Sequence, residues 1–271
     1  MNFGYKKLYV DGQLLDAKGG RKNDVICPGT DEKIAEIAWA TVEDAEKTLM
    51  AASKGFGLWS KLTIWERANW MFKLRAAIIK RETELREAIM YEMGKTYEAT
   101  EEDYEILIDA LEWYPQEMMH RREEIIPDVD GTHQHYLVSE PAGVAIAFLA
   151  WNFPLLNVGY KLGPALAAGC SIIIKPSASA PLSAYLVGEI CYEIGFPAGV
   201  INILTGPNSE VSDTLSSSPI PKVVTIIGST ATGRKLIASC STSIKRTSME
   251  LGGNAPMIIF PMRTLKQPLM L

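Results

Sequence analysis

Short apolar runs alternate with amphipathic segments through the second half of the chain. Stretches of strand length lie at residues 143–149, 171–175, 200–204, 223–227 and near 247–249, and segments with helical spacing lie between them. Continuously apolar strands joined by helices are typical of a parallel sheet covered on both faces. The pattern therefore predicts the α/β class, with a Rossmann-like, doubly wound parallel sheet.

The first half of the chain has a different pattern. Short strand-like runs and glycine-containing turns at residues 5–38 predict turns and edge strands. From Val42 the spacing becomes helical, with Thr41 as the expected helix cap. It stays helical through residue 93 and again over 97–122, with Gly94 as a break. We therefore expect an N-terminal helical layer.

Polar residues and glycines stand where the predicted parallel strands end. They are Asn152, Lys175, Gly206, Gly228 with Ser229, and Glu250. Sheets of this kind bind ligands beyond the carboxyl ends of their strands. These positions therefore predict a ligand site at one edge of the sheet.

Three of these positions have competing interpretations. The turn at 228–233 fits a phosphate at free backbone N–H groups, or only a capped turn, because it departs from the G-x-G-x-x-G fingerprint. Lys175 presents a charged donor at the sheet edge, or is a surface lysine whose stem covers the strand. Asn152 caps the next helix, or donates to a developing oxyanion.

Glu250 stands before a Gly-Gly turn, which is typical of a positioned general base. Such a base serves a nucleophile. The residues after Glu250 contain no cysteine and only one hydroxyl side chain, that of Thr264. We therefore expect a cofactor-binding portion without a reactive half.

Composition and charge exclude several classes of function. The 271 residues are 47% hydrophobic and 22% charged, with a net charge of −5, which favours a globular fold and disfavours a nucleic-acid partner. The N-terminal residues lack the pattern of a signal peptide, and no stretch has the roughly 18 apolar residues of a membrane helix. We predict a cytoplasmic protein that binds neither nucleic acid nor membrane.

Side chains that bind metals do not occur at recognisable spacings. The four cysteines form no C-x-x-C pair and are expected to be reduced core residues. His133 and His135 can share one face of a strand, but a third ligand is lacking. The acids at residues 98–105 are interpreted as a solvated helix face rather than a cation site. No metal site is predicted.

Five sequence motifs accompany the predicted sheet edge. They are Trp151-Asn152-Phe153-Pro154, Lys161-Leu162-Gly163-Pro164-Ala165-Leu166, Ile174-Lys175-Pro176-Ser177, Gly228-Ser229-Thr230-x-x-Gly233-Arg234 and Glu250-Leu251-Gly252-Gly253-Asn254. In this order they resemble the motif series of the NAD(P)-dependent aldehyde dehydrogenases, and the resemblance runs from about residue 9 to residue 260. It implies the aldehyde dehydrogenase fold without most of the catalytic domain, because the family's nucleophilic cysteine lies a few dozen residues beyond the last motif.

The resemblance also implies roles for single residues. Asn152 would be the oxyanion-hole amide, Glu250 the general base, and Lys161 a supporting residue beside Asn152. Lys175 would contact the adenosine ribose, and Ser229 the pyrophosphate. Cofactor binding as a whole would fall on Trp151, Lys175, Ser177, Ala178, Gly206, Gly228 and Ser229. In the implied reaction a cysteine thiolate attacks the aldehyde, a hydride passes to the nicotinamide, and water releases the acid.

Cofactor choice and assembly follow from the same resemblance. NAD-preferring relatives commonly carry a glutamate three residues after the lysine, where this chain has Ala178. We therefore expect NADP to be tolerated or even preferred over NAD. Residues 132–141, as the hairpin partner of the first parallel strand, resemble the family's oligomerisation strand. A homo-oligomer is implied.

The predicted organisation is a cofactor-binding domain at residues 1–260 and an atypical tail at 261–271, which lacks the acidic helix start usual in the family. We expect the NAD(P)-binding portion of an aldehyde dehydrogenase that, at full length, oxidises a small aldehyde such as succinate semialdehyde or lactaldehyde to its acid. This portion alone would be inactive. The alternative is a non-catalytic dinucleotide-binding or interaction module.

Overall fold

The centre of the molecule is a seven-stranded sheet, seen in a computed structural model that describes residues 1–258. Its strand order is β12-β11-β8-β9-β10-β2-β3. The five strands from β8 to β12 run parallel to one another, as predicted. They are β8 (Val144–Phe148), β9 (Ser171–Lys175), β10 (Ile201–Ile203), β11 (Pro221–Ile227) and β12 (Arg246–Glu250). The prediction of a doubly wound parallel sheet is confirmed.

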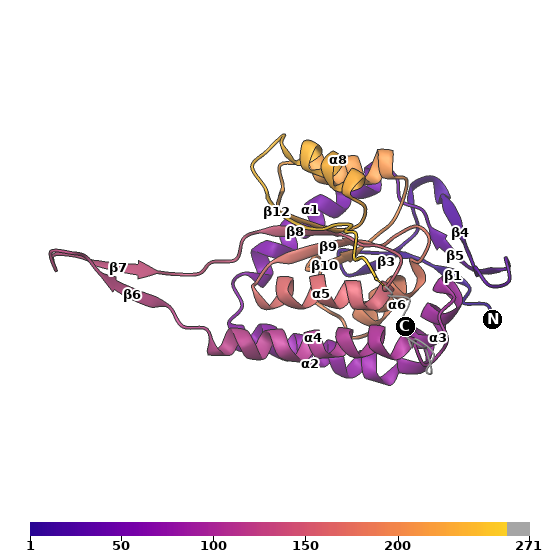
Figure 1. Ribbon diagram of the computed structural model, residues 1–271, viewed down its shortest axis with the longest axis horizontal. Coiled ribbons are helices and arrows are strands. Elements are labelled where there is room, and N and C mark those ends of the chain that lie inside the picture. The colour runs from indigo at the N-terminus through magenta and orange to yellow at the C-terminus, as the bar shows by residue number, and fades with distance from the viewer. Residues whose placement is uncertain (259–271) are drawn as a thin grey trace.

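Helices cover both faces of this sheet (Figure 1). One face carries α5 (Pro154–Ala167) and α6 (Leu182–Glu193), and the other carries α1 (Val42–Trp59), α7 (Asp213–Ser217) and α8 (Thr230–Cys240). A π-helical turn at Asn208–Ser212 precedes α7. Because both faces are covered, every residue of β8, β9 and β10 is buried.

The predicted helical layer lies beneath α5 and α6 (Figure 1). It consists of α2 (Ile64–Lys80), α3 (Glu82–Met93) and α4 (Thr100–His120). Thr41 caps α1 through a capping box with Asp44, and Gly94 ends α3 in a left-handed conformation with φ of 80°, so both predicted signals are confirmed. The chain also breaks at Arg81, which separates α2 from α3.

The sequence pattern predicted that the N-terminal strands are edge strands, but not all of them are. β2 (Leu8–Val10) is fully buried between β10 and the edge strand β3 (Gln13–Leu15). A separate three-stranded sheet has the order β1-β5-β4, with β5 (Lys33–Ala38) between β1 (Tyr5–Lys6) and β4 (Lys22–Ile26). The prediction was wrong because the sequence of a short strand does not reveal which strands pair with it.

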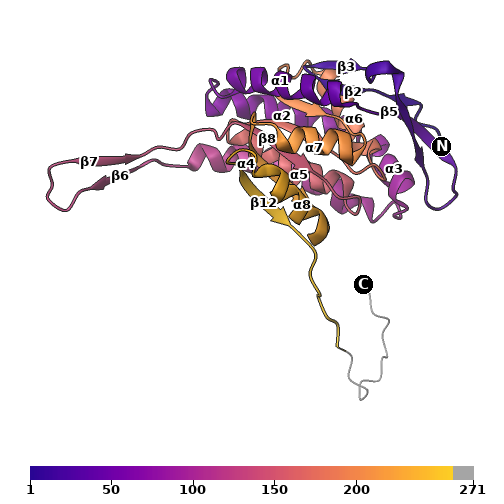
Figure 2. The ribbon, with the colours of Figure 1, turned by 90° about the horizontal axis from the view of Figure 1, so that it is seen from above.

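A two-stranded ribbon projects from the body of the protein (Figures 1 and 2). It pairs β6 (Glu124–Pro127) with β7 (Gln134–Leu137) in antiparallel register. The segment 132–141 was expected to pair with the first parallel strand, β8, but its partner is β6. β8 has no room for it, because β8 already lies between β9 and β11.

Helices α4 and α5 pack unusually closely, through two glycines. A Cβ atom added at Gly159 would lie 2.9 Å from the Leu107 Cα atom, and one added at Gly163 would lie 2.7 Å from the Tyr114 ring. Any larger residue would therefore force the two helices apart.

Of the helices that the structure describes, none combines the length and hydropathy needed to cross a membrane. The predicted tail at residues 261–271 lies outside the described residues.

Candidate functional site

The strand order places a crevice at the carboxyl edge of the sheet. From the central strand β8 the chain continues outward through β9 and β10, and then returns to the other side of β8 to form β11 and β12. A doubly wound sheet binds its ligand where the order reverses in this way, here between β8 and β11. The segments that leave these two strands carry Trp151 and Asn152 on one side and Gly228 and Ser229 on the other.

Lys161 and Glu250 form an ion pair at this edge. The Nζ atom of Lys161, on α5, donates to Oε1 of Glu250 at the end of β12. The lysine side chain is buried, whereas half of the glutamate side chain is exposed. The buried lysine therefore fixes one side of the Glu250 carboxylate, and the other side is accessible to solvent. Sequence reasoning associated Lys161 with Asn152 and missed this pairing across 89 residues.

Asn152 lies in the loop between β8 and α5. Its Oδ1 atom accepts a hydrogen bond of 3.4 Å from Nδ2 of the buried Asn157, which also donates to the Ala150 carbonyl at 3.3 Å. The N-cap residue of α5 is Phe153, and no side chain of its own segment caps it. The helix-capping interpretation of Asn152 is therefore wrong. Because Asn157 binds the oxygen of the amide, the NH2 group of Asn152 is left as the donor.

Lys175 ends β9 with its side chain buried, so the surface-lysine interpretation is wrong. Its Nζ atom donates to Oδ1 of Asn208 at 2.9 Å. Burial lowers the pKa of Lys175 to about 8, and no carboxylate opposes this shift. The site therefore contains a buried ammonium group whose charge has no ionic partner among the residues that the structure describes.

The segment after β11 begins α8 with an exposed turn. Ser229 is the N-cap of α8, and its Oγ atom accepts from the Thr232 backbone N–H at 3.2 Å. The Gly228 N–H donates to the Glu250 carbonyl at 3.0 Å, which joins the ends of β11 and β12. The capped turn proposed from the sequence is confirmed. No carboxylate of residues 1–258 accepts a hydrogen bond from the remaining N–H groups of this helix start.

The starts of α5 and α6 are different, because buried carboxylates from the helical layer occupy them. Asp103 of α4 accepts from the Leu156 N–H at 3.3 Å and pairs with Lys95 at 2.5 Å. Glu92 of α3 accepts from the N–H groups of Leu182 and Ser183. Burial raises the pKa of both carboxyl groups, that of Glu92 to about 7.

Sequence reasoning missed both carboxylates. Asp103 was placed on a solvated helix face, but its side chain is fully buried, whereas the neighbouring Glu101, Glu102 and Glu105 are exposed as expected. Glu92 was not among the predicted site residues. A signal existed, because Glu92 occurs at a buried position of an amphipathic helix where an apolar residue is usual.

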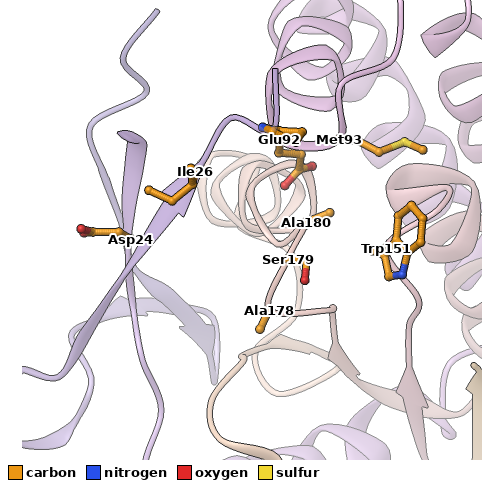
Figure 3. A pocket seen from close by; sticks show the side chains of 9 residues that line it. Asp24, Ile26, Glu92, Met93, Trp151, Ala178, Ser179 and Ala180 are labelled. Atoms are coloured by element: carbon orange, nitrogen blue, oxygen red, sulfur yellow. The ribbon is translucent and has the colours of Figure 1, made fainter. Parts of the chain in front are cut away.

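A cleft of about 470 Å³ lies beside the β9–α6 loop (Figure 3). Trp151 lies on one side and Asp24 on the opposite side, and Ala178, Ser179 and Glu92 lie between them. Trp151 is 57% exposed.

The other predicted site residues lie in the loops that follow β9 and β10 at this edge of the sheet. Ser177 and the exposed Ala178 follow Lys175 in the β9–α6 loop, where the Ser177 Oγ atom accepts from the Ser179 N–H at 3.3 Å. Gly206 follows β10, and a Cβ atom there would lie 2.5 Å from the Ala40 carbonyl oxygen. Gly206 is therefore required by close backbone packing.

Within residues 1–258 the thiols are buried, and no cluster of metal-binding side chains occurs. All four cysteines are free and buried, as predicted, and burial raises the pKa of Cys191 and of Cys240. In the same residues, no three His, Cys, Asp or Glu side chains gather in a way that could hold a metal ion. His133 instead contacts Asp128 in the turn of the ribbon.

The fold and its edge residues define a doubly wound α/β protein with a ligand site at the carboxyl end of its parallel strands. The model of the aldehyde dehydrogenase family matches residues 15–269, and the chain belongs to this family. The predicted resemblance is confirmed.

Known relatives match more than nine tenths of the chain. The chain is 35% identical to glutarate-semialdehyde dehydrogenase of Pseudomonas aeruginosa over 94% of its own length and 53% of that protein. It is 31% identical to the NADP(+) succinate-semialdehyde dehydrogenase of Escherichia coli, over 96% and 54%. The crystal structure of betaine aldehyde dehydrogenase from Staphylococcus aureus with NAD+ superposes with a TM-score of 0.88 at 30% identity, over 92% and 50%. The chain spans about half the length of the curated relatives it matches.

Proposed function

We propose that this chain is the NAD(P)-binding portion of an aldehyde dehydrogenase, which at full length oxidises a small aldehyde to its carboxylic acid. One observation carries the proposal. Among the α-helices that follow β8, β9 and β11, those after β8 and β9 begin at buried carboxylates, and α8 begins at a hydroxyl cap open to solvent. Only α8 can therefore offer its positive end to an anionic ligand.

The residues at this edge fit a dinucleotide. Ser229 and the first N–H groups of α8 suit a pyrophosphate, which needs backbone donors and a helix start. Gly228, which has no side chain, permits close approach of the pyrophosphate. Lys175 offers a buried ammonium donor to the adenosine ribose. Trp151, Ser177, Ala178 and Gly206 shape the adjoining loops.

The chemistry falls to two other groups. A bound NAD(P) supplies the hydride acceptor. Asn152 presents its NH2 group to the developing oxyanion, since Asn157 binds its oxygen. Glu250 removes a proton as the general base, and Lys161 holds its carboxylate in position. The buried thiols of this chain are unsuited to attack an aldehyde, so we place the nucleophile outside residues 1–258.

The relatives support the choice of substrate and assembly. Their names specify glutarate semialdehyde and succinate semialdehyde, both small aldehydes, and we extend that class of substrate to this protein. The ribbon of β6 and β7 exposes apolar side chains that suit association between copies, which supports a homo-oligomer. They are Ile125, Ile126, Val129, Tyr136, Leu137 and Val138. Reduced cysteines and the acidic charge suit a cytoplasmic protein.

Calorimetric titration with NAD and NADP tests the binding half of the proposal. Lys175→Ala should weaken dinucleotide affinity by about 1–3 kcal/mol, the usual value of a charge-assisted hydrogen bond. Lys80→Ala, at the exposed end of α2, is the matched control and should change nothing. Equal affinity in wild type and a folded Lys175→Ala protein would remove Lys175 from the site.

A second candidate function is a non-catalytic dinucleotide-binding or interaction module, and the burial of all four thiols favours it for the isolated chain. Both candidates predict that the chain alone forms no NAD(P)H from succinate semialdehyde or lactaldehyde. An experiment that joins this chain to the catalytic half of a family member distinguishes the two candidate functions. Restored turnover that disappears in Glu250→Gln supports the dehydrogenase, and continued inactivity supports the module.

A further inference from the structure

The buried ammonium group of Lys175 has one hydrogen-bond acceptor in the described part of the chain, and that acceptor is an amide. Asn208 stands at the start of the π-helical turn after β10, 33 residues from Lys175 in sequence. Asn208 is an exposed residue and lies at the same edge of the sheet. π-Helical turns are rare and are frequently found at functional sites.

The orientation of the Asn208 amide is set by two donors. Its Oδ1 atom accepts from Lys175 Nζ at 2.9 Å and from Ser212 Oγ at 3.2 Å. An amide oxygen has two lone pairs, and both are used. The NH2 group must therefore point away from Lys175 and Ser212, and no acceptor for it occurs among residues 1–258.

The charges around this amide favour an anionic group. Lys175 is not neutralised by a carboxylate, since burial alone accounts for the change in its pKa. The acid nearest to Asn208 along the chain, Glu210, is held by Arg21 at 2.8 Å. Three residues beyond Lys175, the loop carries Ala178, where an acidic side chain would repel a phosphate.

We propose that Asn208 selects for a dinucleotide that carries a phosphate on the adenosine ribose. Its oxygen holds the Lys175 ammonium group in place, and its NH2 group donates to the 2′-phosphate of NADP. NAD, which has a hydroxyl at that position, gains less from the same donor. This inference rests on the proposed function, because it requires that Lys175 contacts the adenosine ribose.

Asn208→Asp is the sharpest test, because it keeps the shape of the side chain and an oxygen acceptor for Lys175 but replaces the NH2 donor with a negative oxygen. Titration at pH 7 should show NADP affinity reduced about tenfold or more, as expected when a donor to a charged group becomes a like charge. NAD affinity should stay within about threefold of wild type. The affinity ratio is the readout, since a general structural defect would weaken both ligands.

Ser212→Ala is a second variant that leaves Asn208 itself intact. It removes one of the two donors that orient the amide, so NADP affinity should fall by a smaller factor, and NAD affinity should not change. A ratio of NADP to NAD affinity that is unchanged in Asn208→Asp would overturn the inference and leave the proposed function standing. Absence of any dinucleotide binding by the wild-type chain would overturn both.

Discussion

Helices α5 and α6 begin in a different environment from α8, although all three follow parallel strands of one sheet. Asp103 and Glu92, from the helical layer, bind the first N–H groups of α5 and α6. Among residues 1–258, the start of α8 has only its own Ser229 as a side-chain cap. The positive end of a helix can be satisfied by the protein or by a ligand. Because the helical layer supplies carboxylates to α5 and α6, the start of α8 is the one of the three that remains available to a ligand.

Loss of the Asp103 carboxylate should have the largest effect on this contrast. Asp103→Ala leaves Lys95 half-buried without its partner and removes an acceptor from the start of α5. Breaking a buried ion pair costs about 3–5 kcal/mol, so the free energy of unfolding in urea should fall by that amount. Glu101→Ala, on the exposed face of the same helix, should stay within about 0.5 kcal/mol of wild type. Equal stability of both variants would contradict the burial of Asp103.

Glu92 predicts a dependence of stability on pH. Its folded pKa of about 7 lies above the ordinary value of 4.5, so protonated Glu92 favours the folded state. The stability that it contributes is fully present below about pH 4.5 and is lost as the pH rises to about 7, by at most about 3 kcal/mol. Glu92→Gln should flatten the stability profile between these pH values. Asp103 would account for the slope that remains, because its pKa is also raised.

A carboxylate added on the ligand side should act on binding rather than on folding. Ala178 is exposed in the loop that leads to α6. Ala178→Glu should shift preference toward NAD by about tenfold, through repulsion of the 2′-phosphate, with little change in the free energy of unfolding. Ala178→Gln, which has the same shape without the charge, is the matched control. If both variants shift the preference equally, the effect is steric.

The cap of α8 should give the smallest effect. Ser229→Ala removes the acceptor for the Thr232 N–H and should cost about 1 kcal/mol of stability. Saturating NADP should recover part of this loss if the ligand binds the same N–H groups. Ser241→Ala, just after the end of α8, tests whether the loss is specific to the helix start. Full stability of Ser229→Ala without ligand would show that water replaces the cap.

The strands, their parallel arrangement and most of the edge residues could be predicted, because apolar runs and the glycines and polar residues after them are local signals. Lys175 is one example, since its position depends only on the strand that it ends. The partners of these residues could not be predicted. Glu250 meets Lys161 across 89 residues, and Leu156 meets Asp103 across 53. Asp103 was also concealed among exposed acids on the same helix.

The close contact of α4 with α5 through Gly159 and Gly163 makes the two halves of the chain one unit of folding. β2 adds a second connection, because it supplies a strand to the sheet that residues 144–250 build. A fragment that began at residue 143 would lose this strand, the lower cover of α5 and the carboxylates of Asp103 and Glu92. Any division of this protein into independently expressed modules must therefore keep the helical layer and the sheet together.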